Sequence, residues 1–168
     1  MFLLRRLLLL LCASLSTVCH ALPTDAGQTM HITANSTSFN YKKGTGIYEG
    51  NVIVTQGKTR LEADRLITRN NLQHKIQQVL AYGLKQRAHY MTYLSETDTL
   101  QLNAEAEIIR FYPFRSLVVL EGNASVRHGE DLFEGPVAIY DMKNQTVNAP
   151  HSKNGRSKIL IQPDREAL

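Results

Sequence analysis

Hydrophobic and polar residues alternate through residues 47–68. Val52 and Val54 alternate with Asn51 and Thr55, and Gly57 interrupts the run. Leu61 and Ala63 then alternate with charged residues as far as Asp64. Alternation with a period of two, divided by a glycine, is typical of a half-buried β-hairpin. This stretch therefore predicts two antiparallel strands.

The hairpin pattern recurs 72 residues later, at 119–140. The two stretches align without gaps, and seven of the 22 aligned pairs are identical, including Glu-Gly-Asn at 49–51 and 121–123. Ala34/Ala106 and Phe39/Phe111 keep the same spacing. A repeat of this length predicts two similar lobes of stacked strands. We expect each Glu-Gly-Asn triplet at a strand boundary, where glycine permits the backbone turn and asparagine caps it.

Shorter alternating or apolar runs predict further strands. They lie near 30–34, 39–41, 76–83, 88–94, 100–104, 108–111, 117–120 and 159–161, whereas 144–155 is rich in loop-forming residues. Pro136 occupies the position of Asp64 in the second hairpin. Because proline has no N–H to donate, its strand is predicted to be an edge strand or just beginning there. No helix is predicted after residue 21, so the predicted fold class is all-β.

Residues 1–21 have the pattern of a secretory signal peptide. Arg5 and Arg6 precede an apolar run from Leu7, and Ala21 is a small residue of the kind that precedes cleavage. We predict removal of 1–21, a short polar lead at 22–27, one domain at 28–163 and a tail at 164–168. Acylation of Cys19 is the alternative, and Val18 before it disfavours a lipoprotein.

Composition after residue 21 excludes several classes of function. Both cysteines, Cys12 and Cys19, lie in the segment predicted to be removed, so no disulfide, thiolate nucleophile or cysteine metal site is expected. The remaining 17 Lys and Arg residues nearly balance 15 Asp and Glu residues. This is not the basic excess expected of a nucleic-acid-binding protein.

No motif predicts catalysis, a metal site or a cofactor. Glu49 and Glu121 recur in place, as do Glu62 and Glu134, and paired carboxylates can serve acid–base chemistry. Recurrence at the repeat spacing favours a structural role in turns and register. The histidines after residue 21 are scattered without ligand spacing, at His31, His74, His89, His128 and His151.

Three runs carry a family resemblance. They are Gly-Asn-Val-Ile-Val-Thr-Gln-Gly at 50–57 with Ala-Asp-Arg at 63–65, Glu-Gly-Asn at 121–123, and Lys-Ile-Leu-Ile-Gln-Pro at 158–163. The chain resembles the OstA-like family of periplasmic lipopolysaccharide-transport proteins over residues 28–163. The resemblance implies a twisted V-shaped β-jellyroll that opens into an apolar groove. It also implies a non-enzymatic periplasmic protein that carries lipopolysaccharide from the inner to the outer membrane.

The alternating apolar residues are the candidate binding residues. By pattern alone they form an ordinary sandwich core, whereas the resemblance implies a groove that shields acyl chains from water. The candidate groove residues are Met30, Ile32, Phe39, Val52, Val54, Leu61, Ala63, Leu102 and Val126. Six basic residues either meet lipid phosphates or form a solvated face: Lys42, Lys43, Lys58, Arg60, Arg65 and Arg69.

The first and last strands are candidate open edges for β-augmentation, in which strands of two chains pair. The resemblance implies that Met30, His31, Ile32 and Thr33 face an LptC-like inner-membrane protein. It implies that Lys158, Ile159, Leu160 and Ile161 face an LptD-like outer-membrane protein. Copies of the chain would associate head to tail.

Three alternatives remain open at this point. One is an LptC-like member of the same pathway, which would keep its N-terminal segment as an anchor. Another is a secreted β-sandwich that binds glycan or builds filaments and lacks a lipid-sized apolar channel. The third is a hydrolase, for which no catalytic constellation is present.

Overall fold

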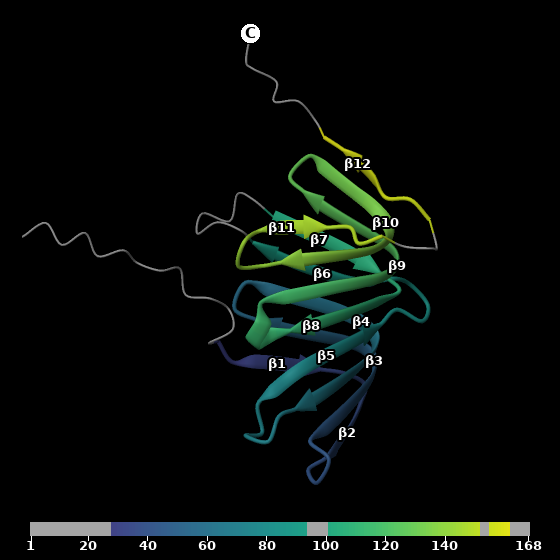
Figure 1. Ribbon diagram of the computed structural model, residues 1–168. Coiled ribbons are helices and arrows are strands. Elements are labelled where there is room, and N and C mark those ends of the chain that lie inside the picture. The colour runs from purple at the N-terminus through teal and green to yellow at the C-terminus, as the bar shows by residue number, and fades with distance from the viewer. Residues whose placement is uncertain (1–27, 94–100, 152–154, 162–168) are drawn as a thin grey trace, which may run out of the picture.

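The fold is built from short and long antiparallel strands (Figure 1). This computed structural model describes residues 28–93, 101–151 and 155–161. The predicted signal peptide, polar lead and C-terminal tail lie outside these residues. The elements are β1 (Met30–Thr33), β2 (Ser36–Asn40), β3 (Thr45–Gln56), β4 (Thr59–Asn70), β5 (Ile76–Tyr82), β6 (Ala88–Tyr93), β7 (Gln101–Ala106), β8 (Ile108–Tyr112), the 3-10 turn η2 (Pro113–Arg115), β9 (Leu117–His128), β10 (Asp131–Asp141), β11 (Thr146–Asn148) and β12 (Lys158–Leu160).

The predicted hairpin and its repeat are the pairs β3–β4 and β9–β10. Each pair is interrupted at one point, where two residues of one strand face one residue of the other. Gly50 and Asn51 lie opposite Asp64 in the first pair. Gly122 and Asn123 lie opposite Pro136 in the second. Such an insertion is a β-bulge, which bends the strand and increases its twist.

The backbone at the two bulges is nearly identical. φ is 78° at Gly50 and 79° at Gly122, and it is 47° at Asn51 and 48° at Asn123. These left-handed values suit glycine and asparagine better than other residues. The prediction that Glu-Gly-Asn marks a strand boundary was therefore wrong. The triplet lies inside a long strand, because the left-handed residues bend the strand without ending it.

Pro136 also lies inside its strand, and the prediction of an edge strand or a strand start was wrong. β10 is flanked by β9 on one side and by β11 and β12 on the other. The register of β10 against β9 shifts between Gly135 and Val137, so Pro136 sits in the bulge. A bulge leaves one residue outside the ladder, and proline there sacrifices no ladder hydrogen bond.

The bulges divide the fold into two sheets that share the four long strands. On one side of the bulges, β2, β3, β4, β5, β8, β9, β10 and β11 pair in that order, and we name this sheet I. On the other side, β1, β3, β4, β6, β7, β9, β10 and β12 pair in that order, as sheet II. The two sheets meet along the line of bulges, as in the predicted V-shaped jellyroll.

The repeat spans the whole described fold. β2 and β3 shifted by 72 residues give the bounds of β8 and β9. β1 and β4 shifted in the same way give the bounds of β7 and β10 to within about one residue at each end. The linkers correspond as well, because the Asn35 N–H donates to Gly50 O and the Glu107 N–H to Gly122 O, each at 2.9 Å. The two halves form one continuous stack rather than separate lobes, since β5 pairs with β8 and β6 with β7.

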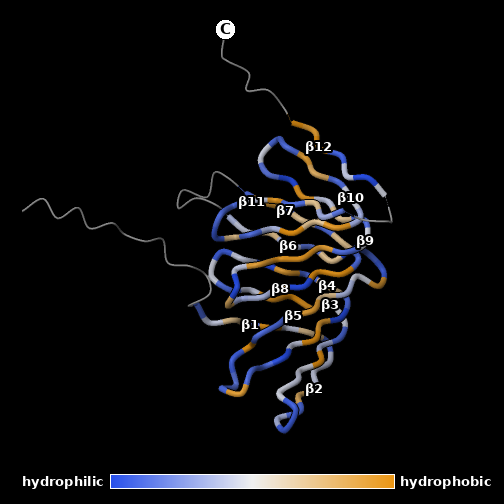
Figure 2. The backbone as a smooth tube through the Cα atoms, in the orientation of Figure 1, coloured by the Kyte–Doolittle hydropathy of each residue, from blue (hydrophilic) through white to orange (hydrophobic). Residues whose placement is uncertain are grey.

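The core lies between the two sheets. Its buried residues come from both, and Tyr90 of sheet II contacts Phe111 of sheet I with ring centroids 6.3 Å apart. Hydrophobic stretches concentrate in the strands, while most turns are hydrophilic (Figure 2). The region 144–155, predicted as loop, contains the short strand β11. The described residues contain no helix that could span a membrane.

Candidate functional site

The inner face of sheet II carries an unbroken apolar row from one edge to the other. Strand register places one side chain of each strand beside the next. The row is Ile32, Val54, Leu61, Tyr90, Ala104, Val126, Phe133 and Ile159. Its interior members are buried, whereas Ile159 on the edge strand β12 is 61% exposed. The apolar surface thus continues to both ends of the sheet.

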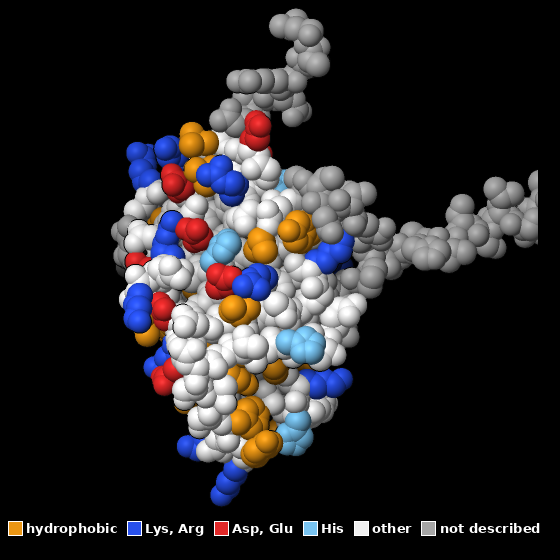
Figure 3. Space-filling model, turned by 180° about the vertical axis from the view of Figure 1, so that it is seen from behind, with side chains coloured by type: hydrophobic (Ala, Val, Ile, Leu, Met, Phe, Trp, Pro, Cys, Tyr) orange, Lys and Arg blue, Asp and Glu red, His pale blue; other side chains and the backbone are white. Residues whose placement is uncertain are grey.

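Sheet I carries a corresponding row on its own inner face. The row is Phe39, Gly46, Thr68, Val79, Phe111, Val118, Tyr140 and Val147. Phe39, on the edge strand β2, is 39% exposed and makes an edge-to-face contact with the ring of Tyr41 at 4.8 Å. Large apolar side chains therefore reach the surface at the β1–β2 end. Hydrophobic side chains gather toward that end of the molecule when it is seen from behind (Figure 3).

The structure brings most of the predicted groove residues together. Five of them, Val52, Val54, Leu61, Leu102 and Val126, are at most 4% exposed and belong to one core cluster. Met30, Ile32 and Ala63 are partly buried and pack against that cluster. Phe39 stands apart on the edge of sheet I. The predicted groove is thus a packed interior between the sheets, and its half-buried part lies at the β1–β2 end.

Sequence reasoning missed several members of the rows. Phe133 is 7% exposed and lies between Val126 and Ile159. The repeat could have found it, because Phe133 corresponds to Leu61. Tyr140 of sheet I was also missed, because an aromatic residue with a hydroxyl group does not by itself indicate a core position.

The interior contains polar groups. The Thr59 hydroxyl donates to the Thr92 hydroxyl at 3.1 Å, and both residues are buried. Within the described part of the chain, the hydroxyl groups of Thr68 and Tyr140 have no hydrogen-bond partner. Burial raises the pKa of Tyr140 to about 12, because the low-dielectric interior disfavours the phenolate.

The predicted basic residues do not form one face. Arg60 pairs with Glu62 at 2.6 Å, and Arg65 pairs with Glu49 at 3.2 Å. Lys58 lies in the β3–β4 turn at the end of sheet II. Lys42, Lys43 and Arg69 lie instead at the turn end of sheet I, where Asn70 N–H donates to Gly44 O at 2.8 Å.

The titratable residues of the part of the chain that the structure describes form mainly ion pairs. There, His, Asp and Glu side chains form no group of three that could hold a metal ion. Glu62, Glu121 and Glu134 are engaged with Arg60, Arg110 and Lys158. The Glu121 and Glu134 pairs join neighbouring strands, whereas Arg60 and Glu62 lie on the same strand, β4.

Two sheets that share four long strands and enclose rows of core side chains reaching exposed edge strands define a β-jellyroll with open edges. The family described as LptA/(LptD N-terminal domain) LPS transport protein matches residues 31–146. The chain belongs to this family.

Relatives and a solved structure agree with this assignment. The lipopolysaccharide export system protein LptH of Pseudomonas aeruginosa is 30% identical, with coverage of 90% of this chain and 89% of that protein. The protein LptA of Escherichia coli K12 is 26% identical over 86% of this chain and 77% of that protein. A crystal structure of Pseudomonas LptH, described as a periplasmic component of the lipopolysaccharide transport device, superposes with a TM-score of 0.77 at 28% identity. It covers 84% of this chain and 100% of that one.

Proposed function

We propose that this protein is a non-enzymatic periplasmic carrier that binds lipopolysaccharide between its two sheets and bridges the inner and outer membranes. The observation that carries the proposal is the pair of inner rows, which run from β1 and β2 to β12 and β11. Family membership and the names of the relatives support the ligand. Export by removal of residues 1–21 would deliver the protein to that compartment.

The acyl chains enter the interior at the β1–β2 end. Met30 and Ile32 are only partly buried there, and Phe39 is exposed, so few side-chain contacts have to be given up. Deeper insertion separates the sheets at Val52, Val54 and Leu61, with acyl chains replacing the contacts across the core. Burial of each CH₂ group contributes about 0.8 kcal/mol, so several chains provide ample binding energy.

Site-specific photocrosslinking in growing cells tests this function. A photoreactive amino acid at Ile32 or Phe39 should form an adduct with lipopolysaccharide. The matched controls are His31 and Thr33, which are exposed and alternate with Ile32 on the opposite face of β1. Equal labelling from both faces, or no lipopolysaccharide adduct from any position, would contradict binding between the sheets.

The edges support head-to-tail association through the repeat. Inside the chain, β6 of the first half pairs with β7 of the second half. β12 occupies the position of β6, because Ile159 faces Phe133 as Tyr90 faces Leu61. β1 in turn corresponds to β7. The last strand of one copy can therefore pair with the first strand of the next as β6 pairs with β7.

This equivalence specifies the register between copies. Tyr90 pairs with Ala104 inside the chain, and Ala104 corresponds to Ile32. Ile159 of one copy would therefore lie beside Ile32 of the next, and the sheet II row would continue unbroken. In sheet I, Val147 corresponds to Val79, which pairs with Phe111. Val147 of one copy would then lie beside Phe39 of the next and cover the exposed Phe39 ring.

Engineered cysteines test the register, because no natural cysteine follows residue 21. We would mix mature Ile159→Cys with mature Ile32→Cys under mild oxidation and separate the products by non-reducing electrophoresis. This mixture should give a crosslinked dimer. The control mixture of Ile159→Cys with Thr33→Cys should give a much lower yield. A cysteine at residue 33 lies one position away and on the other face. Equal yields, or none, would refute this register.

The same edges serve the membrane partners in this proposal. The β1 edge receives the last strand of an LptC-like inner-membrane jellyroll, and the β12 edge pairs with an LptD-like outer-membrane protein. In both cases unpaired backbone groups of an edge strand complete their ladder with another chain. Crosslinking in cells from Thr33 and from Lys158 should separate the two partners by molecular mass. A single partner captured from both edges would contradict the assigned polarity.

A further inference from the structure

A recess opens on the outer face of sheet I, away from the inner rows. It encloses about 470 Å³, within the size range of ligand sites. Arg69, Asn71, Gln77 and Gln78 line it from the β4–β5 side. Tyr112, Phe114 and Arg115 line it from β8 and η2. These segments meet because β5 pairs with β8.

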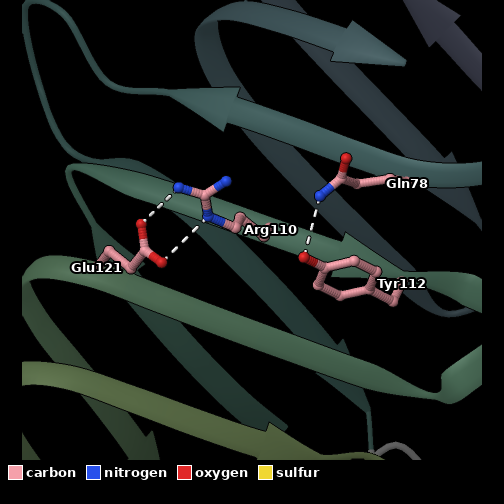
Figure 4. Close-up of polar contacts among 4 residues, drawn as sticks. All are labelled: Gln78, Arg110, Tyr112 and Glu121. Carbon is pink, nitrogen blue, oxygen red and sulfur yellow. Dashed lines mark hydrogen bonds and ion pairs between the residues drawn. The ribbon is translucent and has the colours of Figure 1, made fainter. Parts of the chain in front are cut away.

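Two hydrogen bonds connect Arg69, Gln78 and Tyr112 in the recess. The Gln78 amide Nε2 donates to the Tyr112 hydroxyl at 3.0 Å (Figure 4). The Arg69 Nη1 donates to Gln78 Oε1 at 3.2 Å. The Arg115 guanidinium carbon lies 5.9 Å from the centroid of the Tyr112 ring. Arg69 thus contacts the Gln78 amide, and Arg115 lies near the ring of Tyr112.

The charge of the recess is entirely positive. No carboxylate lines it, and Arg69 and Arg115 make no ion pair with any described residue. By contrast, Arg60, Arg65, Arg87 and Arg110 each pair with a glutamate. Paired arginines stabilise strands, whereas these two remain available to an anion. Guanidinium groups bind carboxylate and phosphate oxygens through two parallel N–H donors.

Neighbouring turns extend the positive charge. Lys42 and Lys43 lie in the β2–β3 turn, which contacts the end of β4 through Asn70 N–H and Gly44 O. Lys143 lies in the β10–β11 turn, which contacts η2 through Met142 N–H and Ser116 O at 2.8 Å. Asp141 is the acidic residue of that turn, and its carboxylate accepts the backbone N–H groups of Lys143 and Asn144.

The recess also offers an aromatic surface beside its amides. Phe114 is 58% exposed on η2, although a phenyl ring is usually buried. Its apolar face can pack against the C–H face of a sugar ring. Asn71, Gln77 and Gln78 supply amides that can both donate to and accept from hydroxyl groups. Aromatic, amide and guanidinium groups around one hollow match a hydroxylated ring that carries negative charge.

We propose that this recess binds an anionic saccharide, meaning a sugar that carries phosphate or carboxylate groups. Arg69 and Arg115 bind the anionic groups, Gln78 binds ring hydroxyls and Phe114 packs against the ring. If the saccharide is the sugar part of a bound lipopolysaccharide, this assignment rests on the proposed function. The site would then hold the polar part of the molecule outside sheet I while the acyl chains lie between the sheets.

Calorimetric titration of the mature chain with deacylated lipopolysaccharide tests the site without acyl chains. The double variant Arg69→Gln/Arg115→Gln should weaken saccharide binding at least tenfold, and Phe114→Ala should weaken it severalfold. The matched control is Arg127→Gln, which removes an exposed arginine from β9 in sheet II. Inorganic phosphate should bind far more weakly than the saccharide. Phosphate binding of equal strength would overturn the assignment to a sugar.

Intact lipopolysaccharide separates this inference from the proposed function. If the parent binds the intact lipid but not the deacylated saccharide, the saccharide site is wrong and the proposed function stands. The same holds if parent and double variant bind the saccharide equally. If Arg127→Gln weakens saccharide binding as much as the double variant does, the loss reflects overall charge. That result would also contradict a saccharide site in the recess. If neither ligand binds the parent chain, both proposals fail.

Discussion

The guanidinium of Arg110 donates two hydrogen bonds to the carboxylate of Glu121, at 3.1 and 2.8 Å (Figure 4). The two residues lie on neighbouring strands of sheet I, diagonally across the β8–β9 ladder. These bonds raise the pKa of Arg110 above its usual value. Leu80 and Val119 are the register partners of Arg110 on the adjoining strands, so the ion pair lies beside apolar side chains on the outer face.

A double-mutant cycle should measure this pair. Arg110→Ala, Glu121→Ala and the double variant should give a coupling free energy of about 0.5–1 kcal/mol, because both side chains are about one-third exposed and solvent screens the charges. The coupling free energy should decrease when the salt concentration is raised from about 0.05 to about 0.5 M, because the added ions screen the two charges. Urea denaturation measures it. A coupling near zero at low salt would contradict the bidentate geometry.

Asp64 should make the fold sensitive to acid. Its carboxylate accepts the backbone N–H groups of Leu84 and Lys85 at 2.8 and 2.7 Å. The Lys85 bond is the main cause that lowers the pKa of Asp64 below its usual value. A lowered pKa in the folded state stabilises the fold above the pKa of the unfolded chain, about 3.9. That contribution is lost as the pH falls through the folded value.

The variant Asp64→Asn tests this relation. It should be less stable than the parent at pH 7, and the difference should shrink as the pH falls below about 4. Chemical denaturation at a series of pH values measures both. A difference that stays constant down to the acid limit would show that the charge of Asp64 contributes nothing.

Gly122 should not tolerate a side chain. Its φ is 79°, and a Cβ atom there would lie 2.4 Å from Glu107 Oε2 and 2.9 Å from Glu107 Cβ. Gly122→Ala should therefore lower the free energy of unfolding by about 1–3 kcal/mol, from strain and crowding together. Gly50→Ala should behave similarly, since its Cβ would lie 2.7 Å from Asn35 Nδ2. Thermal unfolding measures the stability of both variants. If neither variant is less stable than the parent, the bulge geometry is wrong.

Removal of the Tyr140 hydroxyl should stabilise the empty protein. The residue is 1% exposed, and its hydroxyl has no hydrogen-bond partner in the described part of the chain. An unsatisfied buried polar group costs about 1–3 kcal/mol, so Tyr140→Phe should raise the free energy of unfolding by about 1 kcal/mol. Denaturant unfolding measures this. A destabilised variant would mean that the hydroxyl has a partner in solution.

Carboxylates at the inner face should block lipid transport. Ile32→Asp and Phe39→Asp should abolish or strongly reduce lipopolysaccharide binding, because a carboxylate among acyl chains is costly to desolvate. Phe39→Asp should accumulate normally, since Phe39 is 39% exposed. His31→Asp on the opposite face of β1 is the control and should bind normally. Full lipopolysaccharide binding by both inner variants would show that these residues do not line the site.

The sequence determined the strands and their repetition. Alternation and glycine positions were sufficient for the β3–β4 hairpin, and the 72-residue repeat pointed to its counterpart, β9–β10. Period-two alternation also identified β7, although Ala104 to Glu107 favours a helix by local propensity. These features were predictable because local steric preference and side-chain alternation act along the chain itself.

Only the tertiary structure decided how the strands change partners. Glu-Gly-Asn and Pro136 look like strand ends in the sequence, yet they form bulges that let each long strand serve two sheets. The inner rows could not be predicted as rows, since they depend on register between segments distant in the chain, such as Leu61 beside Tyr90 and Val79 beside Phe111. The outer recess depends on the β5–β8 pairing in the same way. Register is set by packing and backbone hydrogen bonds between distant segments, and no local pattern contains it.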